Sequence, residues 1–140
     1  MALLLDTSVW IRFLEGDDRR LGKKSAEFLR QREPAGELVV SDLSFWEVAT
    51  KSAKGKLQLS LDSALWLEEA SRYLGITYAP IDRLALIQST RLPGSPPNDP
   101  MDRILMATAQ LNRATLVTTD AKIIDYAREN EALAVYDARK

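Results

Sequence analysis

The sequence predicts an α/β protein in which a parallel sheet carries helices on both faces. Short apolar runs recur along the chain, and they are long enough only for buried strands. Longer stretches with helical spacing lie between them, and Gly, Pro and Asp residues separate the two kinds of segment. Such an alternation is typical of a parallel sheet, because parallel strands need long crossover connections that are usually helices. The length of 140 residues predicts a single domain, 1–140.

The N-terminal part predicts one strand and two helices. Three leucines at 3–5 indicate a strand that is buried on both faces. The mostly apolar run 9–14 predicts a helix, and Gly16 can end it as a C-cap. Asp17 or Asp18 is expected to cap the second helix. The apolar positions of that helix are Leu21, Ala26, Phe28 and Leu29.

The middle of the chain repeats this pattern. The apolar run 38–40 predicts a second strand, which leads into a third helix. Asp62 or Ser63 is expected to open a fourth helix, and Gly75 to end it. The residues expected on the inner side of the fourth helix are Leu65, Trp66, Leu67, Ala70 and Leu74.

In the last part of the chain, three acids stand where helices begin. Asp82, Asp99 and Asp120 are N-cap residues of the next three predicted helices. The helix over 101–112 has the clearest start, since Pro100 fits the first helical position directly after Asp99. The remaining predicted strands are 76–79, 115–118 and 133–136.

The composition excludes several kinds of active site. The chain has no Cys and no His, which excludes thiolate zinc sites, disulfides, imidazole ligands and a Ser-His-Asp triad. Acid/base or metal chemistry must therefore rest on Asp and Glu, and carboxylate-only sites suit hard cations such as Mg²⁺ or Mn²⁺. The net charge of −1 gives no overall basic surface for nucleic acid. No apolar run spans a membrane and no signal peptide is evident, so we expect a cytoplasmic protein without membrane contacts.

Four acids are expected just beyond strand ends or in the adjoining helical turns: Asp6, Glu47, Asp102 and Asp120. Each has a purely structural interpretation. Asp6 and Asp120 can cap helices, and Asp102 can complement a helix dipole. Glu47 can complete a capping box with Ser44, or it can pair with the lysine four residues later.

Taken together, the four acids predict a cation site. The carboxyl ends of parallel strands meet at one sheet edge, where ligand sites of open α/β sheets lie. Two carboxylates about 4 Å apart repel by about 4 kcal/mol at an effective dielectric constant near 20, and bound cations remove this cost. One or two Mg²⁺ ions there can activate water for phosphodiester cleavage. The hydroxyls expected to support the acids are Thr7, Ser8, Thr118 and Thr119.

Four motifs, in order, resemble those of PIN-domain proteins of the VapC toxin type. The motifs are Leu5-Asp6-Thr7-Ser8; Ser41-Asp42-Leu43-Ser44-Phe45-Trp46-Glu47-Val48-Ala49-Thr50-Lys51 with its tail Gly55-Lys56-Leu57; Asp99-Pro100-Met101-Asp102-Arg103-Ile104-Leu105-Met106-Ala107-Thr108-Ala109; and Thr115-Leu116-Val117-Thr118-Thr119-Asp120. The resemblance covers essentially the full length. It implies a three-layer α/β/α fold with a five-stranded parallel sheet in the order 3-2-1-4-5.

The resemblance also assigns the site. The acidic quartet of the family maps to Asp6, Glu47, Asp102 and Asp120, and Asp99 matches a further acid beside the quartet. One departure is visible, because many relatives carry a His where this chain has Pro97. That His lies outside the quartet, so its replacement is expected to alter the entrance loop and not to remove activity.

The function implied is an endoribonuclease toxin that depends on Mg²⁺ or Mn²⁺. It would cleave structured RNA (tRNA or rRNA) with metal-activated water and so inhibit translation. A cognate antitoxin would bind and block it, and relatives usually form homodimers. The residues expected to contact RNA are Lys51, Lys54, Lys56 and Arg103. The apolar residues considered for an interface are Trp10, Phe13 and Trp46, of which at least two are expected in the core.

Other functions remain open on the sequence. A PIN-domain nuclease of housekeeping RNA processing, or a catalytically silent PIN-like binding module, would share most of these motifs. A signalling receiver domain normally has paired acids after the first strand and a lysine directly after the last, whereas this chain has one acid at Asp6, and Asp137 and Ala138 directly follow Tyr136. A phosphatase of the haloacid dehalogenase type needs Asp-x-Asp at the first strand, where Ser8 takes the second position.

Overall fold

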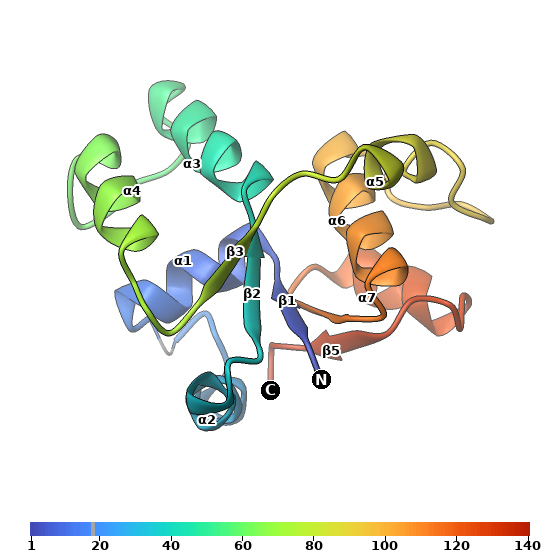
Figure 1. The fold of residues 1–140 in the computed structure, drawn as a ribbon, viewed down its shortest axis with the longest axis horizontal. Helices are drawn as coiled ribbons and strands as arrows, with labels where there is room; N and C mark the ends of the chain where they lie inside the picture. The colour runs from blue at the N-terminus through green and yellow to red at the C-terminus, as the bar shows by residue number, and fades with distance from the viewer. Residues whose placement is uncertain (18) are drawn as a thin grey trace.

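A five-stranded parallel sheet forms the centre of the molecule in the computed structural model, which describes residues 1–17 and 19–140 (Figure 1). The strand order is β3-β2-β1-β4-β5, so the predicted fold and order are confirmed. This order also differs from the 2-1-3-4-5 order of receiver domains. The strands are β1 (Leu3–Leu5), β2 (Leu38–Ser41), β3 (Thr77–Ala79), β4 (Thr115–Thr118) and β5 (Val135–Asp137).

Helices cover both faces of the sheet. In Figure 1, α1 to α4 lie on one side of the strands and α5 to α7 on the other. The alternation of side chains in β1 explains the two layers: Leu3 and Leu5 belong to the core under α1 to α4, whereas Leu4 belongs to the core under α6 and α7. The helices are α1 (Thr7–Glu15), α2 (Lys23–Arg32), the 3₁₀ helix η1 (Glu33–Ala35), α3 (Leu43–Ala53), α4 (Ser63–Ser71), α5 (Arg83–Gln88), α6 (Pro100–Leu111) and α7 (Ala121–Arg128).

Aromatic packing around Trp10 joins α1 to α3 and α4. Trp10 is fully buried, and the centroid of its ring lies 5.0 Å from that of Phe45 and 5.1 Å from that of Trp66. Phe13 is also buried, but 60% of Trp46 is exposed. The expectation that at least two of the three interface candidates lie in the core is therefore confirmed, and Trp46 alone is a surface residue.

The register of the central strands brings the site residues together. Leu5 of β1 pairs with Val117 of β4, and the Asp6 amide donates to the Val117 carbonyl at 3.0 Å. Asp6 and Thr118 therefore leave the sheet side by side. Among the described residues, no helix combines the length and apolar character that a membrane span requires.

The start of α2 differs from the prediction. The helix begins at Lys23 with Gly22 as its N-cap, and the Asp17 carboxylate instead accepts from the amides of Arg19 and Arg20. Asp18, the other predicted cap, lies outside the described residues. The Gly22 amide donates to the carbonyl of Ala138 at 3.0 Å. This contact with the C-terminal segment is between residues far apart in sequence, and local cap signals do not report it.

The predicted boundaries of α4 and of the last strand were also wrong. Helix α4 ends at Ser71 and not at Gly75, and Leu65 and Leu74 are 53% and 100% exposed. Helical spacing shows which residues share a face but not whether another element covers that face. The last strand is shifted toward the C-terminus, because β5 begins at Val135 and ends at Asp137.

Candidate active site

The four predicted acids line one cavity of about 160 Å³ at the carboxyl edge of the sheet. They come from four separate segments: the end of β1, helix α3, helix α6 and the end of β4. The described residues that line it are Asp6, Thr7, Ser8, Glu47, Lys51, Asp99, Asp102, Leu105, Thr119 and Asp120. The structure thus brings together the acids and three of the four supporting hydroxyls, and the fourth, that of Thr118, bonds to Asp6 directly.

Asp6 is the most buried of the acids, with 8% of the residue exposed. It caps α1, because its Oδ1 accepts from the amide of Val9 at 2.8 Å, and its Oδ2 accepts from the hydroxyl of Thr118. Burial raises the pKa of the Asp6 carboxyl to about 6 against the lowering effect of these hydrogen bonds, and the charge of Glu47 adds to the rise. An ionised Asp6 is therefore held at a cost in the metal-free protein.

Glu47 is fixed from two sides. The Thr7 hydroxyl donates to Glu47 Oε1 at 2.6 Å and lies 2.8 Å from the Ser44 hydroxyl. The Lys51 ammonium lies 2.6 Å from Glu47 Oε2. The pairing with the lysine four residues later is thus present, while a capping box is not, since Asp42 and not Ser44 is the N-cap of α3.

Helix α6 supplies Asp99 and Asp102. Asp99 is the N-cap, and its Oδ1 accepts from the amides of Met101 and Asp102 at 2.8 Å and 3.3 Å. The predicted cap before Pro100 is confirmed, so capping does not require Asp102. The pKa of the Asp102 carboxyl is raised to about 7, mainly by burial and in addition by the charges of Asp99, Asp120 and other site acids.

Asp120 caps α7 and also faces the cavity. Its Oδ1 accepts from the Lys122 amide at 2.8 Å, and its own amide donates to the Thr118 hydroxyl at 3.0 Å. Because the Thr118 hydroxyl in turn donates to Asp6, one buried side chain links two of the acids. Capping and membership of the acidic cavity are therefore compatible roles for Asp6 and Asp120.

The family follows from the sequence over nearly the whole chain. The PIN-domain family matches residues 3–129.

The chain belongs to the PIN-domain family.

Within that family, the chain groups with the VapC proteins. Ribonuclease VapC22 of Mycobacterium tuberculosis (strain ATCC 25618 / H37Rv) is 30% identical over 124 residues, which are 86% of this chain and 88% of the relative. The resemblance inferred from the four motifs is thereby confirmed.

Solved structures share the PIN fold. VapBC2 from Rickettsia felis, bound to a DNA fragment from its promoter, matches with a TM-score of 0.66 and 14% identity over 97% of this chain and 98% of that chain. A toxin–antitoxin complex from Klebsiella pneumoniae matches with a TM-score of 0.58 and 19% identity over 95% and 96%. FitAB bound to the IR36 DNA fragment matches with a TM-score of 0.59 and 15% identity over 99% and 96%.

The predicted RNA-contacting cations of this PIN domain have different surroundings. Lys54 and Lys56 are exposed at the end of α3. Arg103 Nε instead donates to the Pro97 carbonyl at 2.5 Å, so this side chain holds the loop before α6. Lys51 lies in the acidic cavity. Burial disfavours its charge, but the hydrogen bond to Glu47 and the surrounding acids leave the pKa of the Lys51 ammonium above its ordinary value.

Sequence reasoning missed Arg12. Its guanidinium donates to the Thr119 hydroxyl at 2.9 Å, and its charge acts on Asp6. Arg12 stands four residues after Ser8 in α1, so it lies on the helix face that borders the cavity. The spacing from Ser8 was the signal that could have identified Arg12 from the sequence. It does not by itself indicate the contact with Thr119, which is more than one hundred residues away in sequence.

The donor chemistry of the cavity suits a hard divalent cation. Its polar lining consists of carboxylates and hydroxyls around one ammonium group, and such oxygens are what Mg²⁺ and Mn²⁺ prefer. Among residues 1–17 and 19–140, however, no three acids stand in ligand positions around a single point. The carboxylates instead bond to Val9, Thr7, Thr118 and Lys51. The site fits the ion by composition, and the acids must approach one another to hold it.

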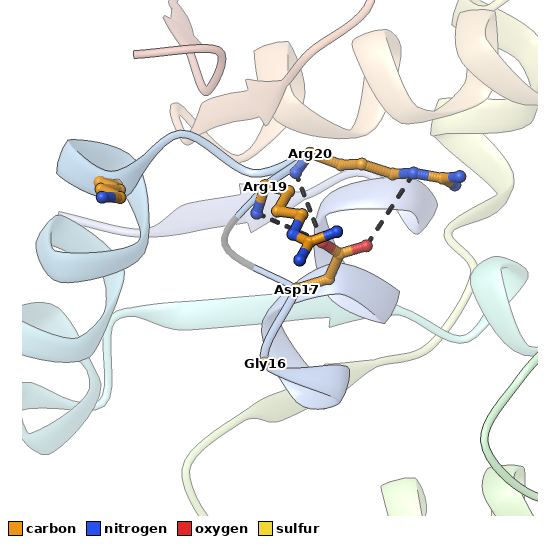
Figure 2. A pocket seen from close by; sticks show the side chains of 5 residues that line it. Gly16, Asp17, Arg19 and Arg20 are labelled. Atoms are coloured by element: carbon orange, nitrogen blue, oxygen red, sulfur yellow. Dashed lines mark hydrogen bonds and ion pairs between the residues drawn. The ribbon is translucent and has the colours of Figure 1, made fainter.

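A second cavity, of about 570 Å³, lies apart from the acids. It is lined by Gly16, Asp17, Arg19, Arg20 and Lys23. Figure 2 shows Asp17 facing Arg19 and Arg20, to which it is bound by hydrogen bonds and an ion pair. Among the described residues that line this cavity, Asp17 is the one acid, and it is already paired with arginine, so these residues do not form an acid set like that of the first cavity.

Proposed function

We propose that this PIN domain is an endoribonuclease toxin of a toxin–antitoxin pair that requires Mg²⁺ or Mn²⁺. The observation that carries the proposal is the convergence of Asp6, Glu47, Asp102 and Asp120 on one cavity at the carboxyl edge of the sheet. Two of these acids are held in conditions that raise their pKa, which is a cost to the metal-free fold. A functional site explains why the chain keeps them together.

The residues of the cavity have distinct parts in this proposal. Asp6, Glu47, Asp102 and Asp120 would hold one or two ions, and a bound ion supplies an activated water and charge stabilisation for phosphodiester hydrolysis. Thr7 and Thr118 orient carboxylates through the hydrogen bonds already described. The further lining residues Ser8, Asp99 and Thr119 complete the polar rim.

Divalent-dependent RNA cleavage by purified protein tests this proposal. Asp6→Asn is expected to abolish cleavage of tRNA and rRNA in Mg²⁺ or Mn²⁺, and to relieve the growth arrest caused by induced expression. Its metal-free stability should be equal or higher, because one repelling buried charge is removed. Asp125→Asn is the matched control, since the Asp125 side chain is 68% exposed on α7. Metal-dependent cleavage that persists in Asp6→Asn refutes the assignment.

The RNA would approach over the exposed end of α3. Lys54 and Lys56 follow the cavity residue Lys51 in sequence, directly after the end of α3, and are exposed. If both contact phosphates, replacing both with Ala weakens RNA binding and reduces the salt slope by about 2. Arg113→Gln is the control, because Arg113 precedes β4 at the opposite end of the sheet. An unchanged slope in the double variant would show that these lysines only face solvent.

An antitoxin partner and a homodimer belong to the same proposal. The structural neighbours include toxin–antitoxin complexes, and apolar side chains are exposed both on α3, at Trp46, and on α5, at Leu84 and Ile87. Co-expression with a protein from a neighbouring reading frame should suppress toxicity and yield a complex on size-exclusion chromatography.

Two alternatives give different results in these assays. A catalytically silent binding module would bind RNA without cutting it in any divalent metal. A housekeeping nuclease would cleave RNA without arresting growth, and its neighbouring frame would not suppress any effect. Sequencing RNA ends after induced expression distinguishes both from a toxin that cuts specific tRNA or rRNA sites.

A further inference from the structure

One cation stands inside the acidic cavity. Lys51, in the last turns of α3, reaches back to Glu47, and its ammonium nitrogen lies 2.6 Å from Glu47 Oε2. It lines the same cavity as the other acids. The negative charges of Asp99 and Asp102, on α6, also act on it. The ammonium group thus faces acids from two different helices and neutralises part of their mutual repulsion.

This position conflicts with direct metal binding at Glu47. The other carboxylate oxygen, Oε1, already accepts the hydrogen bond of Thr7 at 2.6 Å. A divalent ion that bound Oε2 would share that oxygen with an ammonium group, and the two positive charges would repel each other at close range. An ion can therefore use Oε2 only when the ammonium group moves away.

We propose that Lys51 is a tethered counter-cation that competes with the divalent ion for Glu47 and thereby sets the metal affinity of the site. This inference rests on the proposed function, since it needs the same four acids to hold a metal. In the metal-free protein, the ammonium group compensates the acids. When the ion enters, Lys51 leaves Oε2 and its charge moves toward solvent.

The surroundings of Lys51 allow this displacement. Its side chain is 47% exposed, whereas that of Glu47 is only 13% exposed, so the lysine is the partner free to move. Lys51 has a flexible four-carbon stem with a compact charge, and it lies two residues before the end of α3 at Ala53. An ion pair that is partly open to solvent is weak enough for a bound divalent ion to replace it.

The test measures metal binding directly and does not depend on RNA cleavage. Mn²⁺ dissociation constants are measured by isothermal titration calorimetry and by electron paramagnetic resonance for the full-length wild type, Lys51→Met and Lys54→Met. Met keeps the length of the lysine stem without its charge. Lys54 is the matched control because it is an exposed lysine at the end of the same helix. Melting temperatures are measured in parallel with EDTA and with saturating Mn²⁺.

Lys51→Met is expected to bind Mn²⁺ about tenfold more tightly than the wild type, while Lys54→Met binds like the wild type. In EDTA, Lys51→Met should melt at a lower temperature, because the acids lose their counter-cation, and Mn²⁺ should raise its melting temperature by more than that of the wild type. Lys51→Gln should behave in the same way.

Two other results overturn the inference and can be told apart. If Lys51→Met and Lys51→Gln bind Mn²⁺ as tightly as the wild type or more weakly, and the wild type binds it clearly, the competing role of Lys51 is refuted. The proposed metal-dependent nuclease activity is not affected by that result. No Mn²⁺ binding by any of the four proteins refutes the inference together with the metal requirement of the proposed function.

Discussion

Asp102→Asn is expected to stabilise the metal-free protein at about pH 8 and to change its stability little at about pH 4. The folded state holds the proton of Asp102 more tightly than the unfolded chain does, because the pKa rises from 3.8 to about 7. This preference favours the folded state at low pH and is lost as the pH rises from about 4 through about 7. The asparagine variant keeps an uncharged side chain and avoids that loss.

The magnitude follows from the same pKa. A rise of about 3 units corresponds to about 4 kcal/mol at most, since each unit is worth about 1.4 kcal/mol. Asp102 is only partly buried, so solvent screening lowers this value. The negative charge in the first turn of α6 also stabilises the helix dipole, by about 0.5 kcal/mol, and the variant loses this contribution. We therefore expect a gain of about 2 kcal/mol at about pH 8.

Urea unfolding in EDTA, followed by circular dichroism at both pH values, measures the effect. Asp125→Asn is again the control, with an expected change within about 0.5 kcal/mol at either pH, because its side chain is exposed. Stabilisation by Asp102→Asn of equal size at both pH values would show that charge burial is not its cause. Destabilisation at about pH 8 would refute the reasoning outright.

Four further variants test side-chain packing and bonding by urea unfolding. Thr118→Val should lower the free energy of unfolding by about 1–3 kcal/mol, because the buried hydroxyl bonds to Asp6. An unchanged free energy of unfolding would show that this hydrogen bond does not stabilise the fold. Trp10→Ala should cost about 3–5 kcal/mol and Trp46→Ala less than about 0.5 kcal/mol, since only Trp10 is buried; similar costs would contradict the assigned burial. Gly22→Ala should cost about 1–3 kcal/mol, because a Cβ would lie 1.6 Å from the carbonyl oxygen of the C-terminal residue; wild-type stability would show that the terminus moves freely.

Local signals were enough to predict most of the elements. Three leucines in a row form a strand, and Asp99 followed by Pro100 starts a helix, because both depend on residues adjacent in sequence. The same is true of Asp62, Asp82 and Asp120, whose side chains cap the helices that they precede. The family resemblance supplied the order of the strands, which no local pattern contains.

Boundaries set by distant contacts were not predictable in this way. Helix α2 begins at Lys23, and the preceding Gly22 bonds to the C-terminal segment. The exposure of Leu65 and Leu74 depends on which surfaces remain uncovered after packing. Helical spacing carries no such information, so these predictions failed.

The acidic cavity likewise has features that the sequence predicted and features that only the folded structure shows. The sequence by itself restricted acid/base or metal chemistry to carboxylates, since it has neither His nor Cys, and positions at strand ends or in the adjoining helical turns singled out Asp6, Glu47, Asp102 and Asp120. Only the tertiary structure placed Lys51 among these acids and joined Asp6 to Thr118. The reason is physical: charge compensation depends on distances between side chains on α3, α6 and the ends of β1 and β4, and those distances exist only once the chain has folded.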